Sequence, residues 1–435
     1  MSYEVFYLLF FDNFWFNLCI VFVTIMIYLL IFKKNIYSIF DPLFFYILLS
    51  SAGNSVVFIL FLSGDIPHYY LYQFLLTEAS FILGFFCFKP INLKKIHTAN
   101  NFLSLRITKR IKLLYFISAV LYILSHLVIY IFKGIPLFMP SRLEAYISGY
   151  GFMFSIQTTT QVVVLSILSY KLLLKLRYKL LDYIMIFLFV VFSILSGSKA
   201  VFLNIVFILF YVAYFLSIKM SYPQIMKKFN RISVKFFILA VFTTSVVLWF
   251  VKHENPFFTI VWRVIMTGDV YMMAYVNNNI EMIEGDFLTL VLPYKVVNML
   301  GLDHVKNLGS QLIEIIYQAG LNIGPNARHN ILGYVSFGYW SSFIFSFFIG
   351  ILVGFLRNKL IKLLKLNLES LTIFVLILSS TLNLPADFAY GLFIYISELI
   401  VFSIIYTLSI IFSYEKTQKR FGKTTNFNKN GIYEI

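Results

Sequence analysis

Four basic residues lie where a cation could bind an anion. Two lie beside short turns, and two lie in the long segment 252–332 between apolar runs. Arg142 lies in KGIPLFMPSRLEAYISGYG (residues 133–151), and Lys199 ends the turn SGSK. Arg263 and Arg328 come from the two halves of the long segment. A guanidinium binds phosphate oxygens through paired hydrogen bonds, and an ammonium binds them as a point charge. The set predicts a site where several cations converge on one phosphate-like anion; for each residue, an interfacial cation reaching lipid phosphates is the alternative.

A candidate proton acceptor follows one of these cations directly. Imidazole titrates near neutrality and therefore suits general-base catalysis, and His329 is the neighbour of Arg328. A structural or solvated histidine is the alternative interpretation.

Several carboxylates are rival bases or substrate ligands. On the loops these are Asp269, Glu144 and Asp387, each of which could instead cap a helix or pair with a cation. Glu78 and Glu398 lie inside apolar runs, where an ionisable group is costly and so indicates a function. No HExxH, Walker loop or metal-spaced carboxylate pair is present in the sequence, so neither a metal nor a cofactor is expected.

The elements that must position these residues are membrane-spanning helices. Hydrophobic residues make up 60% of the 435, charged residues 12%, and the mean hydropathy is +0.86. Such a composition, with recurring apolar runs long enough for a helix to cross a bilayer, predicts an all-α polytopic membrane protein. Eleven spans are expected, near residues 14–32, 42–62, 71–88, 113–132, 152–170, 180–196, 200–218, 234–251, 333–356, 370–388 and 391–413.

Charge distribution gives this layout a direction. Alternate loops on one side carry 27 of the 35 Lys and Arg residues and only five of the 19 Asp and Glu residues. Basic loops face the cytoplasm, so the N-terminus is expected outside and the tail inside. The net charge of +16 therefore reflects membrane topology and not nucleic-acid binding. The expected organisation is a transmembrane domain over 1–414 and a basic cytoplasmic tail over 415–435.

One outer loop, residues 252–332, is far longer than its two flanking spans require. Its first half is apolar enough for a re-entrant or interfacial helix that begins near Pro256 and breaks at Gly268-Asp269, with Tyr271 and Tyr275 at the headgroup level. Its second half predicts a short helix within GSQLIEIIYQAG, followed by a turn that leads to Arg328. A loop of this length is usually functional.

The layout resembles that of the Wzy-type O-antigen and capsule polysaccharide polymerases of the bacterial inner membrane. The similarity rests on the SGSK turn, the GIP sequence at 134–136 followed by Arg142, the large late loop, and GPNARHNILGYVSFGYWSSFIFSFFIGILVGF after it. The chain departs from the family at Lys199, where an arginine is typical. A lysine at this position still offers a positive charge, without the bidentate fork.

The resemblance implies a glycosyltransferase that joins oligosaccharide repeat units carried on undecaprenyl diphosphate, on a helical bundle similar to the GT-C type. Arg142, Lys199, Arg263 and Arg328 would then stabilise the departing diphosphate, and His329, with Asp269 as a rival, would deprotonate the acceptor. The implied partners are the donor and acceptor lipids, the bilayer and a chain-length regulator.

Three other functions remain open from the sequence. A flippase would handle the same lipid-linked oligosaccharide, but it is expected to have more spans, short outer loops and cations in a central cavity. An O-antigen ligase shares the large-loop plan, and sequence separates it poorly from a polymerase. A small-solute transporter is disfavoured because no internal repeat is visible in the sequence.

Overall fold

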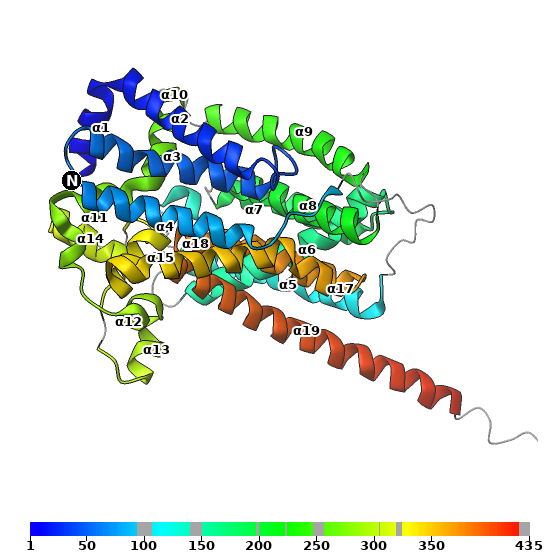
Figure 1. Cartoon of the computed structure of the whole chain (residues 1–435). Coiled ribbons are helices and arrows are strands. Elements are labelled where there is room, and N and C mark those ends of the chain that lie inside the picture. Colours follow the sequence, from blue (N-terminus) through cyan, green and yellow to red (C-terminus); the bar gives the residue numbers. More distant parts are fainter. Residues whose placement is uncertain are drawn as a thin grey trace, which may run out of the picture. The chain divides into compact units, whose positions relative to one another are not determined.

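The computed structural model describes residues 1–93, 107–139, 150–196, 200–221, 224–246, 256–303, 305–318 and 324–425. These parts are helical and contain no strand, as the composition predicts (Figure 1). Contacts divide the chain into two compact units, while the predicted boundary between a transmembrane domain over 1–414 and a tail over 415–435 stays a prediction. Unit 1 holds residues 1–96, 227–364 and 377–395; unit 2 holds 97–226, 365–376 and 396–435.

Eight described segments are long and apolar enough to cross a membrane, which makes the chain a polytopic membrane protein. Seven match predicted spans, and the eighth, Phe257–Met282, belongs to the long loop. The predicted spans 180–196 and 200–218 correspond to shorter apolar helices, while 71–88 and the described part of 234–251 overlap less apolar helices. The total of eleven therefore stays a prediction.

Unit 1 contains the helices that surround Arg328 and His329. Its N-terminal helices are α1 (Tyr3–Asp12), α2 (Phe14–Phe32), α3 (Pro42–Leu62) and α4 (His68–Phe86). The start of α3 is fixed by Asp41, whose side chain accepts a hydrogen bond from the Leu43 N–H, and by Pro42 at the first helical position. Local sequence thus sets where α3 begins.

The long loop folds into short helices. They are α10 (Pro256–Ile265), η5 (Met266–Gly268), α11 (Asp269–Tyr275), η6 (Val276–Met282), α12 (Phe287–Val291), α13 (Tyr294–Met299) and α14 (Leu308–Tyr317). The predicted break at Gly268-Asp269 and the predicted helix within GSQLIEIIYQAG are confirmed. The side chains of Tyr271 and Tyr275 are fully buried in the core of unit 1 and so face protein, while their depth at the headgroup level stays a prediction.

The helix after the loop, α15 (His329–Asn358), is bent back on itself. Gly338 has φ 75° and ψ −179°, a conformation that is essentially restricted to glycine. His329 Nδ1 consequently lies 3.0 Å from Ser346 Oγ, whereas seventeen residues of straight helix would separate them by about 26 Å. Residues 329–337, before Gly338, therefore form a short arm of α15 that turns back toward the interior of the protein. This re-entrant arm places residues 328–330 in the interior.

Glycines bring the longer arm of α15 against α4. A Cβ at Gly350 would lie 2.1 Å from the Phe81 carbonyl oxygen, and one at Gly354 would lie 2.5 Å from that of Phe85. Small residues spaced four apart let helix backbones approach closely in a membrane. Two further helices are short, α16 (Leu360–Leu363) and α18 (Asn383–Ala386). Three helices contribute residues to both units, namely α9 (Gln224–Val246), α17 (Leu368–Thr381) and α19 (Phe388–Thr425).

Unit 2 is built from α5 (Lys109–Phe132), η2 (Pro136–Phe138), α6 (Gly151–Leu174), α7 (Leu180–Leu195) and α8 (Ala200–Lys219). Helix α5 begins at Thr108, whose hydroxyl accepts from the Ile111 N–H. An ion pair between Lys171 and Asp182, 2.7 Å long, joins α6 to α7. A buried ion pair thus links two helices within unit 2.

The contact between α4 and α15 gives a stability prediction. Gly350→Val should lower the thermal midpoint of the purified protein, because overpacking a tight contact typically costs about 1–3 kcal/mol. The matched control is Ala79→Val, which introduces the same side chain on the exposed face of α4. Equal midpoints for the two variants would contradict the close packing at Gly350.

Candidate functional site

Arg328 is a buried cation held by neutral groups. Its side chain donates to Asn54 Oδ1 at 2.5 Å, to the Ser50 carbonyl oxygen at 3.2 Å and to the Thr267 carbonyl oxygen at 2.8 Å. The guanidinium carbon also lies 5.3 Å from the centre of the Tyr271 ring. Only 6% of the residue is exposed. Within the described part of the chain, no carboxylate reaches this guanidinium within ion-pair distance.

The other buried cations of the described residues contrast with Arg328. Arg357 pairs with Asp41 at 2.5 Å, and Lys171 pairs with Asp182 at 2.7 Å. Removing a charge from water costs several kcal/mol, which a directly paired opposite charge offsets best. Arg328 lacks that direct offset, and the carboxylates of Glu78 and Asp269 act on its charge only from beyond ion-pair distance.

The space for the guanidinium comes from a close approach of α3 to η5. A Cβ at Gly53 would lie 2.4 Å from an Arg328 side-chain nitrogen and 2.8 Å from the Gly268 backbone nitrogen. A Cβ at Gly268 would lie 2.0 Å from the Gly53 carbonyl oxygen. Two glycines therefore create the place that Arg328 fills.

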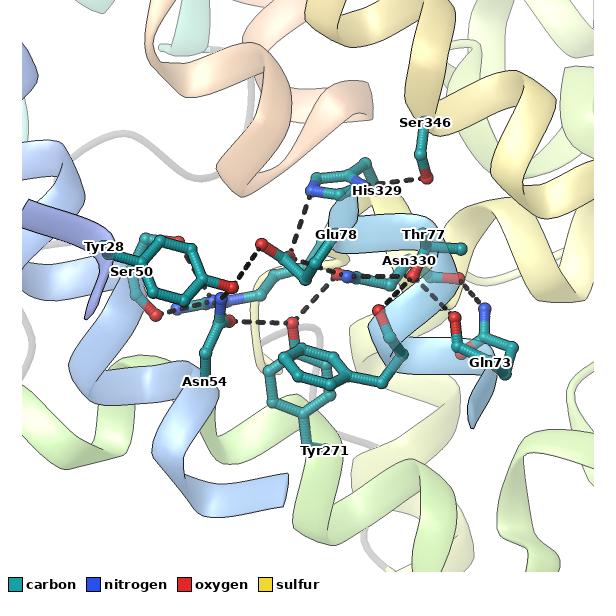
Figure 2. Close-up of polar contacts among 12 residues, drawn as sticks. Tyr28, Ser50, Asn54, Gln73, Thr77, Glu78, Tyr271, His329, Asn330 and Ser346 are labelled. Atoms are coloured by element: carbon teal, nitrogen blue, oxygen red, sulfur yellow. Dashed lines mark hydrogen bonds and ion pairs between the residues drawn. The ribbon is translucent and has the colours of Figure 1, made fainter. Parts of the chain in front are cut away.

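His329 lies between a carboxylate and a hydroxyl. Its Nε2 is 3.5 Å from Glu78 Oε1, and its Nδ1 is 3.0 Å from Ser346 Oγ. The ring stacks on Phe81 with centroids 4.9 Å apart, and 2% of the residue is exposed. Figure 2 shows the imidazole between these two groups. A carboxylate, an imidazole and a hydroxyl in this order can accept and hold a proton.

Asn54 and Tyr28 connect Arg328 to Glu78 without direct contact between the two charges. Asn54 accepts from Arg328 through Oδ1 and donates through Nδ2 to the Tyr28 hydroxyl at 2.9 Å. Tyr28 donates in turn to Glu78 Oε2 at 2.7 Å (Figure 2). The result is a continuous hydrogen-bonded network from the cation to the carboxylate.

Asn330 completes the network on the other side. Its Nδ2 donates to Glu78 Oε1 at 2.8 Å, and its Oδ1 lies 2.9 Å from the Tyr271 hydroxyl. Gln73 donates to the Asn330 carbonyl oxygen at 3.1 Å and to Ser342 Oγ at 3.3 Å, so it fastens both arms of α15 to α4. These hydrogen bonds hold the re-entrant arm of α15 in place at its N-terminal end.

Of the residues predicted from the sequence, the structure brings Arg328 and His329 into this network and places Asp269 close by. The Asp269 carboxylate accepts from the Tyr3 hydroxyl at 2.9 Å. Burial, with the Asp269 charge as a smaller cause, raises the pKa of the Tyr3 phenol well above its usual range, so Tyr3 remains a donor. Asp269 thus has a structural partner of its own.

The remaining predicted residues lie elsewhere or are not described. Arg263 is exposed on α10. Arg142, Lys199 and Glu144 fall outside the described residues, so their expected convergence with Arg328 stays a prediction. Asp387 accepts from the Tyr390 N–H at 3.1 Å, and burial raises the pKa of its carboxyl group. Glu398 is buried in unit 2.

Sequence reasoning missed Asn54, Tyr28 and Tyr271 as parts of the site. The available signal was the run SSAGNS at residues 50–55, a group of small and polar residues in the middle of an otherwise apolar helix. Glu78 was noticed for the same reason, but nothing in the sequence pairs it with His329. Among the described residues, no three metal-ligating side chains come together.

Among the described residues, Arg357 has a carboxylate partner and Arg328 has none within ion-pair distance, so we expect different changes in thermal stability when each site is altered. Arg328→Met should leave the thermal midpoint within a few degrees or raise it, because it replaces a buried cation that has no carboxylate partner. Asp41→Asn keeps the helix cap but breaks the Arg357 pair, a change that typically costs about 3–5 kcal/mol. Equally large losses in both variants would show that Arg328 is a stabilising ion.

Comparison of the chain with protein-family models, with curated proteins and with solved structures finds no match.

Proposed function

We propose that this protein is a metal-independent glycosyltransferase that polymerises oligosaccharide repeat units carried on undecaprenyl diphosphate, at the outer face of the bacterial cytoplasmic membrane. The observation that carries the proposal is a buried arginine, held only by neutral acceptors, directly beside a histidine that contacts a carboxylate. The resemblance to Wzy-type polymerases supplies the substrate class.

The reaction needs one base and one cation. The acceptor hydroxyl oxygen attacks the anomeric carbon of the donor, its proton passes to His329, and the bond from that carbon to the diphosphate breaks. The departing diphosphate keeps the bonding electrons, and its growing negative charge is stabilised by Arg328. A base in this position typically contributes about 10²–10⁴-fold to the rate.

In the described conformation the two residues are enclosed. A diphosphate can reach Arg328 only if it replaces the carbonyl and amide acceptors from Ser50, Asn54 and Thr267. Phosphate oxygens bind a guanidinium more strongly than neutral oxygens do, which favours this exchange. We expect the short re-entrant arm of α15 and the η5 turn to move when substrate binds.

A second candidate is a flippase for the same lipid-linked oligosaccharide. Glu78, His329 and Arg328 are ionisable residues in the membrane part of the chain, beside a helix broken at Gly338. Such features also mark transport pathways. An O-antigen ligase would use the same chemistry with a different acceptor, so only the product distinguishes it from a polymerase.

The function can be tested in cells that lack the gene and carry single variants. Arg328→Ala and His329→Ala should produce surface glycan with a single repeat, and Arg328→Lys should retain part of the polymerisation because it keeps the charge. The measurement is the ladder of surface polysaccharide on a gel. Lys306→Ala is the matched control, because Lys306 is an outer-loop cation in an exposed pair with Glu314.

Each other outcome identifies a rival. Variants that carry no repeat unit on the surface would indicate the flippase. Long chains that stay on the lipid carrier would indicate the ligase. Normal ladders from both Arg328→Ala and His329→Ala would overturn the proposed site.

We also propose the orientation that the basic loops predict, with the N-terminus outside and the C-terminus in the cytoplasm. In a background where Cys19 and Cys87 are replaced by alanine, Lys306→Cys should react with an impermeant maleimide in intact spheroplasts. Lys365→Cys should react only after lysis. Labelling of Lys365→Cys in intact spheroplasts would reverse the topology and move the site to the wrong side for this function.

A further inference from the structure

Glu78 is the most constrained ionisable group of the network. Tyr28 donates to its Oε2 at 2.7 Å, and Asn330 donates to its Oε1 at 2.8 Å. The same Oε1 is the oxygen that lies 3.5 Å from His329 Nε2. The two neutral donors come from α2 and α15, while Glu78 itself belongs to α4. Three helices therefore fix the plane and the direction of this carboxylate.

The imidazole of His329 has little freedom to rotate. One face packs on Phe81, and the two ring nitrogens point toward Glu78 and Ser346. A carboxylate only accepts hydrogen bonds, so the Nε2 that faces it carries the hydrogen. Nδ1 then holds the lone pair and accepts from the Ser346 hydroxyl.

We propose that Glu78 is the positioning residue of His329, and that it makes Nδ1 the atom that takes the proton from the acceptor sugar. This inference rests on the proposed function and adds which nitrogen acts and which residue selects it. The acceptor hydroxyl takes the place of the Ser346 hydroxyl at Nδ1. Its proton moves to Nδ1 as its oxygen bonds to the anomeric carbon.

The arrangement also stabilises the product of that proton transfer. The imidazolium that forms keeps its Nε2–H directed at the Glu78 carboxylate, 3.5 Å away, so that opposite charges face each other. Tyr28 and Asn330 donate to Glu78, and both hydrogen bonds hold the carboxylate in place beside Nε2. The other charged group nearby, Arg328, is held away from Glu78 by Asn54 and remains free for the diphosphate.

The kinetic test uses the full-length protein in proteoliposomes, with lipid-linked repeat units isolated from cells that lack it. Glu78→Gln should lower kcat by about 100-fold, the lower end of a base contribution, while KM for the donor stays within about twofold. Glu78→Asp keeps the charge but shortens the side chain, so it should restore only part of kcat. Glu314→Gln is the control for loss of a carboxylate on the exposed loop.

The outcomes separate this inference from the proposed function. If His329→Ala is inactive and Glu78→Gln has a wild-type kcat, the positioning role is wrong and the function stands. If both variants polymerise normally, the proposed site is wrong, whereas a wild-type protein that forms no polymer in proteoliposomes would overturn the proposed function itself. A proportional rise in KM and fall in kcat, with a lower thermal midpoint, would assign Glu78 a merely structural role and would also overturn the inference.

A spectroscopic readout covers the case in which Glu78→Gln does not fold. In wild-type protein carrying ¹⁵N-labelled histidine, the signal absent from His329→Asn should be that of the Nε2–H tautomer, with Nδ1 unprotonated. Solid-state NMR at neutral pH distinguishes the two tautomers by their ring nitrogen shifts. A signal from the Nδ1–H tautomer would overturn the assignment.

Discussion

The buried charge of Arg328, which no carboxylate of the described residues reaches within ion-pair distance, is the constraint around which much of unit 1 is arranged. A guanidinium without a carboxylate partner persists in the interior only if enough neutral oxygens and an aromatic face surround it. Here α3 supplies Ser50 and Asn54, η5 supplies Thr267, and α11 supplies the Tyr271 ring. The burial of α11 and the glycine contact between α3 and η5 both follow from this requirement.

The turn at Gly338 meets a second requirement, which is to bring a helix start into the interior of a membrane protein. Irregular backbone is tolerated at such depth only where protein covers it. Gln73 fastens the two arms of α15 to α4, and the glycines of the longer arm hold α4 close. Helix α4 therefore supports the re-entrant arm on one side. On the other side, Arg328 at the start of the arm donates hydrogen bonds to Ser50, Asn54 and Thr267.

Elements that depend on apolar length and on turn residues could be predicted from the sequence. Features that depend on the backbone conformation of Gly338 or on contacts between distant residues could not. Apolar length located most spans, and the Gly268-Asp269 break and the helix near 308–317 were found from turn and cap residues. The apolar run at 333–356 gave no sign that Gly338 reverses the chain, because glycine is also common in straight membrane helices. The burial of Tyr271 and Tyr275 within the protein was not predicted, because interfacial and buried tyrosines have the same local pattern. Arg328 and His329 were found by type, but their partners required the fold.

Asn54 explains how one small site can keep a free cation and a charged carboxylate at once. If Arg328 and Glu78 met directly, they would neutralise each other, leaving less positive charge for an anion and less negative charge for His329. An amide accepts at one end and donates at the other, so Asn54 satisfies Arg328 through Oδ1 and reaches Glu78 through Tyr28. An aspartate in its place would pair with Arg328, and an apolar residue would leave that guanidinium without its shortest hydrogen bond. The separation of the two charges is thus a property of this one amide and the phenol beside it.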